Sequence, residues 1–257
     1  MKLQKKLLAL LTAIVLVTQP SCSRFFGKSQ TSNRPSAPEQ AAIDQILQRY
    51  EQALGGRQAI DSLTSYKMEG SFQLAGMNGH IAGWRKDPDK TLTVLEFDRF
   101  GTLKKGFDGE TRWVQTPAGV VSDADAQEEV AEMERETEVF SAGKIKSLFD
   151  TMRLDYNARL DGREVRVIEG KPFTGPAERL YFDVENGLLV RWDMARKQPK
   201  RGTIFVKVHL DDYKDVSGLK VPFKVRFSFE SFSLMVMVEK LEHNVDIDDA
   251  IFRKPSA

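Results

Sequence analysis

The chain has 257 residues, and its 38 basic and 37 acidic side chains leave a net charge of +1 at neutral pH. This balance gives no electrostatic case for nucleic-acid binding. The three histidines lie far apart without metal-ligand spacing, and no nucleophile elbow, phosphate loop or zinc motif is present. We therefore expect no metal, no cofactor and no enzymatic activity.

The N-terminus predicts export from the cytoplasm. Lys2, Lys5 and Lys6 precede an apolar run, Leu7 to Val17, which is shorter than the roughly 20 residues that cross a bilayer as a helix. A basic start, a short apolar run and small residues after it are typical of a secretory signal peptide. We assign this signal to residues 1–21.

The only cysteine, Cys22, follows the apolar run. It is either a leftover residue of an ordinary signal or the acylated first residue of a mature bacterial lipoprotein. Ser21 fits the small residue wanted before an acylated cysteine, whereas Gln19 and Pro20 depart from the usual pattern. We favour acylation, because a single cysteine would seldom fall at this place by chance. Ser23, in place of an aspartate, then favours the outer membrane.

The rest of the chain divides into a tether and one domain. Residues 22–40 are polar, contain prolines and show no periodicity, which predicts a lipidated N-terminus and a flexible tether. Residues 41–257 are enough for a single domain with its own core. The domain opens on a predicted helix that ends at two glycines, residues 55–56. The apolar face of this helix is made by Ile43, Leu47, Tyr50 and Leu54.

From Tyr66 onward apolar and polar residues alternate, which indicates half-buried strands. The first run of predicted strands covers 66–74, 80–86, 91–97, 103–107 and 110–115. The second run covers 154–160, 164–169, 178–184, 188–194, 204–210 and 223–242, with a bulge or turn near Ser231. About ten or eleven antiparallel strands predict a mainly β (α+β) fold, which is an incomplete antiparallel barrel or strongly curved sheet.

A helical insert separates the two runs of strands. Residues 122–140 begin with cap candidates and carry acids in the first turns. A narrow apolar stripe continues into residues 144–152 and predicts an amphipathic helical lid lying on the sheet. The lid residues expected to face the sheet are Val130, Met133, Phe140, Leu148 and Phe149.

The predicted sheet is rich in large apolar residues, with 16 phenylalanines, 8 methionines and 3 tryptophans in the chain. A curved sheet either fills its interior with such side chains or leaves an apolar cavity that accepts acyl chains. On the second interpretation the lid closes over a ring of cavity residues. That ring comprises Phe72, Trp84, Phe97, Trp113, Phe227, Phe229, Met235 and Met237.

Several motifs resemble the LolA/LolB-like, lipoprotein-sorting family across residues 40 to 255. "FDGETRWVQTP" is similar to the family's Asp-Gly-Lys-x-x-Trp stretch, and "VSGLKVPFKVRF" and "NVDIDDAIFRKP" resemble its late strands and closing segment. The resemblance implies an incomplete barrel capped by helices, with an apolar cavity that receives lipoprotein acyl chains. Where the family has an arginine before a proline, this chain has Asp87, and Arg85 or Lys86 is the candidate substitute.

The sequence therefore predicts a monomeric envelope protein, anchored through Cys22 in the outer membrane and facing the periplasm. Its expected ligands are acyl chains of lipoproteins or other lipids, and its expected role is lipoprotein sorting or lipid traffic. The alternative is a non-transporting periplasmic sensor or interaction module with a filled core. A hydrolase acting on envelope lipids is a distant third hypothesis.

Overall fold

The computed structural model describes residues 35–121, 145–173, 175–198 and 202–255. The predicted signal peptide, Cys22 and the lid residues Val130, Met133 and Phe140 lie outside the described residues.

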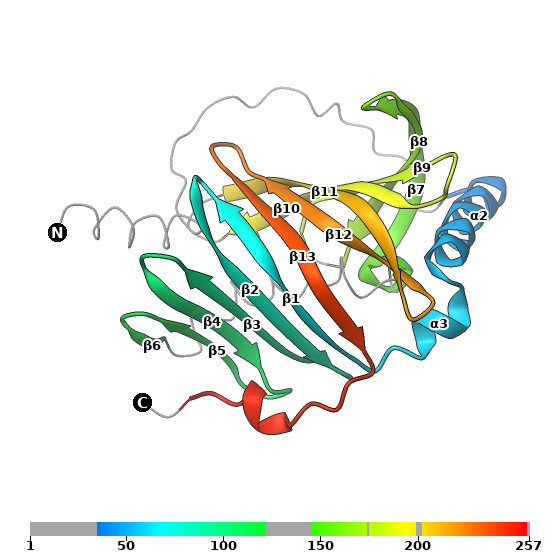
Figure 1. The fold of residues 1–257 in the computed structure, drawn as a ribbon. Coiled ribbons are helices and arrows are strands. Elements are labelled where there is room, and N and C mark those ends of the chain that lie inside the picture. The colour runs from blue at the N-terminus through cyan, green and yellow to red at the C-terminus, as the bar shows by residue number, and fades with distance from the viewer. Residues whose placement is uncertain (1–34, 122–144, 174, 199–201, 256–257) are drawn as a thin grey trace.

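One antiparallel sheet of thirteen strands makes up most of the fold, in the order β6-β5-β4-β3-β2-β1-β13-β12-β11-β10-β9-β8-β7 (Figure 1). The first six strands are β1 (Ser65–Leu74), β2 (Met77–Lys86), β3 (Lys90–Phe97), β4 (Gly101–Phe107), β5 (Arg112–Thr116) and β6 (Gly119–Val121). The others are β7 (Phe149–Leu160), β8 (Arg163–Pro172), β9 (Glu178–Asp183), β10 (Leu189–Gln198), β11 (Gly202–Val216), β12 (Leu219–Ser228) and β13 (Ser233–His243). The sheet is strongly curved, and its edge strands β6 and β7 do not pair with each other.

The predicted fold class, a curved and incomplete antiparallel barrel, is confirmed. The strand count exceeds the expected one because β6 was not predicted and because the break expected near Ser231 is a full turn at residues 229–232, which divides the long 223–242 stretch into two strands. The helical prediction for 144–152 is wrong beyond Leu148. Only η1, a 3-10 helix at Ile145–Leu148, is present there, and β7 begins at Phe149.

Pairing with β8 explains this difference at Phe149. Gly170 of β8 has no side chain, and a Cβ placed on it would lie 2.5 Å from the Phe149 ring. The ring therefore lies flat over the glycine, and burial in the sheet outweighs a helical spacing that residues 145, 148, 149 and 152 satisfy equally well.

Helix α2 (Ala37–Leu54) packs on one face of the sheet, which we call the inner face. As predicted, it buries Ile43, Leu47, Tyr50 and Leu54, and the Tyr50 and Phe182 rings meet edge to face with centroids 5.4 Å apart. The helix begins earlier than expected, inside the segment 22–40 predicted to be a tether. Ser36 accepts a hydrogen bond from the Glu39 amide, and a proline lies in the first turn, which is where prolines fit a helix.

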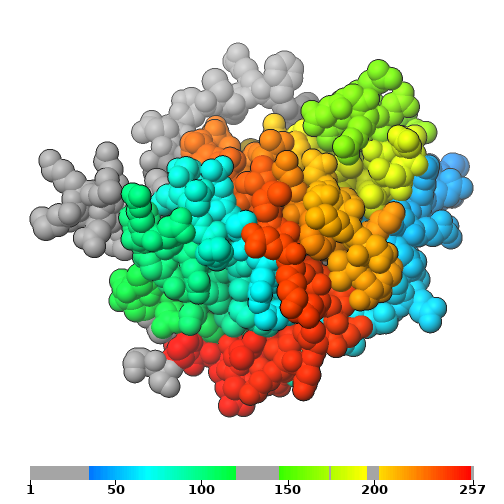
Figure 2. All heavy atoms as spheres, in the orientation of Figure 1, coloured from blue at the N-terminus to red at the C-terminus, as the bar shows by residue number. Residues whose placement is uncertain are grey.

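The C-terminal segment packs on the opposite, outer face of β2 to β5, where Ile247 and Phe252 join a buried cluster. Figure 2 shows this segment, in red, lying against the first strands at one end of the molecule. Asp249, in the 3-10 helix η2 (Asp249–Phe252), accepts hydrogen bonds from Lys86 at 2.8 Å and from Lys90 at 2.5 Å.

These two lysines predict how stability depends on pH. Their hydrogen bonds lower the pKa of Asp249 from 3.8 to about 2. Because the folded pKa lies below the unfolded one, the stabilising contribution is complete above about pH 5 and is lost as the pH falls toward 2. Asp249→Asn should therefore lower the melting temperature at neutral pH, and the difference from the unmodified protein should shrink below about pH 4.

Thermal unfolding followed by circular dichroism from pH 7 to pH 2 measures this difference. Asp98→Asn, in the turn between β3 and β4, is the control, because Asp98 makes no ion pair within the described residues. A difference between Asp249→Asn and the unmodified protein that stays constant down to pH 2 would contradict the prediction.

Candidate functional site

The inner face of the first half of the sheet is an apolar wall. Phe72 of β1 and Phe97 of β3 meet edge to face with ring centroids 5.0 Å apart. Gly79 of β2 pairs with both residues, and a Cβ placed on it would lie 2.6 Å from the Phe72 ring. The two aromatic rings therefore share space that a glycine leaves empty. The wall continues through Leu74, Ile81, Leu103 and Val114, all buried.

The second half of the sheet extends this wall and adds one buried acid. Phe227 of β12 is buried in the same cluster, and Phe149 lies with its ring 6.2 Å from that of Trp192. Glu178, only 1% exposed, accepts a hydrogen bond of 2.8 Å from the indole nitrogen of Trp192. The cluster around this polar pair consists mainly of aliphatic and aromatic side chains, with the hydroxyls of Tyr50 and Tyr66 among them, so its chemistry suits hydrocarbon more than a polar substrate.

Four residues predicted to line the cavity lie on the outer face instead. Trp84 and Trp113 pack with the C-terminal segment, and the Trp113 indole donates a hydrogen bond of 2.7 Å to the Phe252 carbonyl. Met235 and Met237 pair with Gln73 and Ser71 of β1, and Met237 is 39% exposed. The prediction is wrong for all four because successive side chains of a strand point to opposite faces.

The other predicted site residues that lie within the described part of the chain contact the inner face. Phe72, Phe97, Phe149 and Phe227 belong to its buried cluster, and Leu148 and Phe229 are partly buried against it. Sequence reasoning missed Leu74, Leu95 and Leu103, which follow from the same alternation once Phe97 is assigned to the inner face. A binding role for these residues stays a prediction.

The two candidates for the family's arginine separate onto opposite faces. Lys86 donates to Asp249 and to the Ile247 carbonyl on the outer face. Arg85 pairs with Tyr66, an inner-face residue, and its side chain is 11% exposed. Of the two candidates, only Arg85 therefore shares a face with the inner-face cluster.

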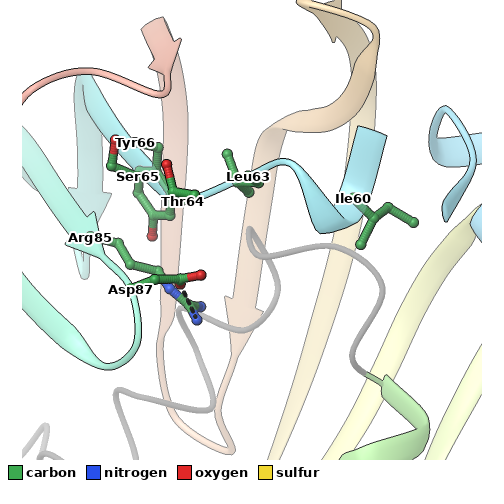
Figure 3. A pocket seen from close by; sticks show the side chains of 7 residues that line it. All are labelled: Ile60, Leu63, Thr64, Ser65, Tyr66, Arg85 and Asp87. Atoms are coloured by element: carbon green, nitrogen blue, oxygen red, sulfur yellow. Dashed lines mark ion pairs between the residues drawn. The ribbon is translucent and has the colours of Figure 1, made fainter. Parts of the chain in front are cut away.

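Arg85 lines a small pocket at the junction of α3 (Arg57–Asp61) and β1. Figure 3 shows its guanidinium turned toward the Asp87 carboxylate, 3.6 Å away. The other lining residues are Ile60, Leu63, Thr64, Ser65 and Tyr66. The pocket volume of about 10 Å³ holds about one water molecule and is far below that of a lipid site. We therefore do not assign ligand binding to this pocket.

Two further findings concern metal binding and membrane-spanning helices in the described residues. No group of three or more His, Cys, Asp or Glu side chains among them could hold a metal ion. Within the same residues, no helix is both long and apolar enough to cross a membrane.

Comparison with known proteins identifies the fold. No family model matches the sequence, and no curated protein matches it significantly. The structure is similar to a LolA superfamily protein from Nitrosomonas europaea, with 12% identity and a TM-score of 0.56 over 82% of this chain and 97% of that one. It is also similar to a DUF1329 family protein from Desulfovibrio piger, with 15% identity and a TM-score of 0.53 over 85% and 98%.

A third similar structure is a domain from Vibrio parahaemolyticus described as an outer membrane lipoprotein-sorting protein. It has 11% identity and a TM-score of 0.51 over 81% of this chain and 96% of that one. At such identities the likeness concerns the fold. The chain therefore has the LolA-like incomplete barrel that its motifs predicted.

Two glycines on β2 allow the packing of the inner face to be tested. A Cβ on Gly79 would lie 2.2 Å from the Glu96 carbonyl oxygen as well as against the Phe72 ring, whereas a Cβ on Gly83 would meet only the Met68 methyl at 3.2 Å. Gly79→Ala should lower the free energy of unfolding by about 1–3 kcal/mol or more through overpacking. Gly83→Ala, on the same strand and face, should stay within about 1 kcal/mol because a flexible methionine can move.

Equilibrium unfolding in urea measures both variants. Equal losses for Gly79→Ala and Gly83→Ala would show that Phe72 and the β3 backbone do not constrain the inner face as described.

Proposed function

We propose that this chain is an exported, lipid-anchored envelope protein that binds acyl chains on the inner face of its open barrel and acts in lipoprotein sorting or lipid traffic. The observation that carries the proposal is the continuous apolar inner face, to which both halves of the sheet contribute buried side chains. The structural similarity to a domain described as a lipoprotein-sorting protein supports the same proposal.

The physical basis is the gain from removing hydrocarbon from water. Each buried methylene of an acyl chain contributes about 0.8 kcal/mol. An open curved sheet gives such a chain a long apolar surface. Its backbone N–H and C=O groups are not left unpaired there, because neighbouring strands hydrogen-bond to one another. Leu95, partly buried between Ile81 and Leu103 on the paired strands, lies on this surface.

Neighbouring positions on β3 provide the test. Leu95 is on the inner face, whereas Val94 packs in the outer cluster with the C-terminal segment, and both are partly buried. Leu95→Gln should weaken binding of a fluorescent fatty acid about tenfold, because the burial of one leucine is worth about 1.5–3 kcal/mol. Val94→Gln should leave this affinity unchanged while lowering stability to a similar extent.

Fluorescence titration of the two variants and the unmodified protein gives the affinities, and native mass spectrometry of protein extracted from membranes identifies co-purified lipid. Saturable binding that both variants weaken equally would argue against an inner-face site.

A filled-core sensor or interaction module is the second candidate, and one observation favours it. Phe72, Phe97, Leu103 and Phe227 are each nearly completely buried in this structure. An acyl chain can reach them only if the atoms that cover them move. Absence of fatty-acid binding and of co-purified lipid, in a protein that is folded, would support the module.

The membrane anchor has its own test. If Cys22 is acylated, radiolabelled palmitate should enter the unmodified protein and not Cys22→Ala, and the variant should move from the membrane fraction to the soluble periplasmic fraction. Unchanged location of Cys22→Ala would contradict the anchor without bearing on ligand binding.

A further inference from the structure

The strands of the sheet end in two rims that differ in chemistry. Because all neighbours are antiparallel, alternate turns lie on the same rim. The first rim contains, among the described residues, the turns at 75–76, 98–100, 117–118, 173–177 and 229–232. The second rim contains the turns at 87–89, 108–111, 161–162, 184–188 and 217–218.

The second rim carries carboxylates throughout. Asp87, Asp108, Asp161 and Glu185 each lie in one of its turns, and in the fifth turn the Asp215 carboxylate accepts a hydrogen bond from the Gly218 amide. On the first rim, the turns at 75–76, 117–118 and 173–177 contain no charged residue, whereas the other two contain Asp98, Arg99 and Glu230. The two rims therefore differ in their affinity for an anionic surface.

The first rim also carries exposed aromatic rings. Phe173, in the turn after β8, is 70% exposed, and Phe205 of β11 is 59% exposed. The two lie at the same part of the rim, because Phe205 pairs with Ala195, whose carbonyl oxygen is 3.9 Å from the position of a Cβ on Gly175.

At the β12–β13 turn, Phe229 and Phe232 stack with centroids 4.4 Å apart and an interplanar angle of 18°. The Phe229 amide donates to the Phe232 carbonyl at 2.9 Å, which fixes the turn. Both rings are partly buried against the inner-face cluster. In Figure 1 this turn and the β1–β2 turn lie side by side at the top of the view. Apolar surface therefore runs from the rim onto the inner face.

Basic side chains flank these rings. Lys207 follows Phe205 by two residues on the same face of β11 and pairs with Ser228, next to Phe229. Arg226 is two residues further down β12 and is exposed, as is Lys207. Neither makes an ion pair with a described residue. Exposed aromatic rings with cations beside them, opposite a rim of carboxylates, match the polarity of an anionic bilayer surface.

We propose that the first rim docks on an anionic phospholipid bilayer, with Phe173 and Phe205 in the interface and Phe229 and Phe232 leading to the inner face. The proposal rests on the proposed function and specifies its geometry: an acyl chain passes between bilayer and inner face along the β12–β13 turn. A protein partner at this rim is the competing occupant.

Quenching of introduced tryptophans by brominated lipid tests the orientation. Full-length protein is bound to vesicles of brominated phosphatidylcholine with phosphatidylglycerol. Phe173→Trp reports on the first rim, and Glu110→Trp, an exposed position on the second rim, is the matched control. The native tryptophans give the background, measured on the unmodified protein. We expect quenching at Phe173→Trp to exceed that background at least twofold and Glu110→Trp to show none.

Charge is tested with the same reporter. Omitting phosphatidylglycerol, or adding Lys207→Gln and Arg226→Gln to the reporter variant, should reduce the quenching severalfold. Equal quenching at both rims, quenching at neither, or quenching that is confined to Glu110→Trp overturns the proposal. Quenching at neither rim, together with saturable capture by a periplasmic protein that Phe173→Ser abolishes, would assign the rim to a protein partner.

The outcome is separable from that of the proposed function. Fatty-acid binding is read in solution with Leu95→Gln, and rim docking is read on vesicles by quenching. A protein that binds fatty acid without quenching at Phe173→Trp refutes only the docking. A protein that docks without binding fatty acid refutes only the carrier function.

Discussion

The pairing of β1 with β13 is the contact on which the architecture depends. It joins residues 66–74 to residues 234–243, and without it the sheet would be two separate sheets of six and seven strands. Gly70 makes the pairing possible, since a Cβ there would lie 2.1 Å from the Met237 carbonyl oxygen. The register shifts by one residue at this point. Because such a shift changes which side chains face inward, it helps to place Val236 and Val238 on the inner face and Met235 and Met237 outside.

Glycines also decide where the large rings lie. Gly79, Gly106 and Gly170 each leave space under an aromatic ring of a neighbouring strand, those of Phe72, Trp113 and Phe149 respectively. Two of these rings lie on the inner face and one on the outer face. An aromatic ring over a glycine brings two strands into close contact without a gap. The inner wall therefore depends on glycine positions as much as on the apolar residues.

The alternation of residues and the Asp-Gly and Asn-Gly turns were enough to predict most of the strands and the open antiparallel fold, but not β6 or the start of β7. They were not enough to assign faces where both faces of a strand are apolar. Trp84 and Trp113 are buried on the outer face only because the C-terminal segment returns to cover β2 to β5. The residues around the two tryptophans do not predict this long-range contact. The strand conformation of Phe149 was missed for a related reason: a spacing of three and four residues fits a helix, but Gly170, which leaves space under the Phe149 ring, lies in another strand.

The two rims make the ends of the open barrel chemically different: one carries exposed aromatic rings, and the other carries carboxylates. Burial of the inner face is strong: each Phe or Leu gains about 1.5–3 kcal/mol. An acyl chain of about fourteen methylenes gains about 11 kcal/mol on the same scale, which is comparable to what four or five such side chains gain. On the proposed function, the exchange of four or five side-chain contacts for acyl contacts is therefore nearly balanced in free energy. A carrier needs this balance, because a chain bound much more tightly would not be released. Under the proposed docking, the first rim is where this exchange takes place, since Phe229 and Phe232 extend the inner face to its edge.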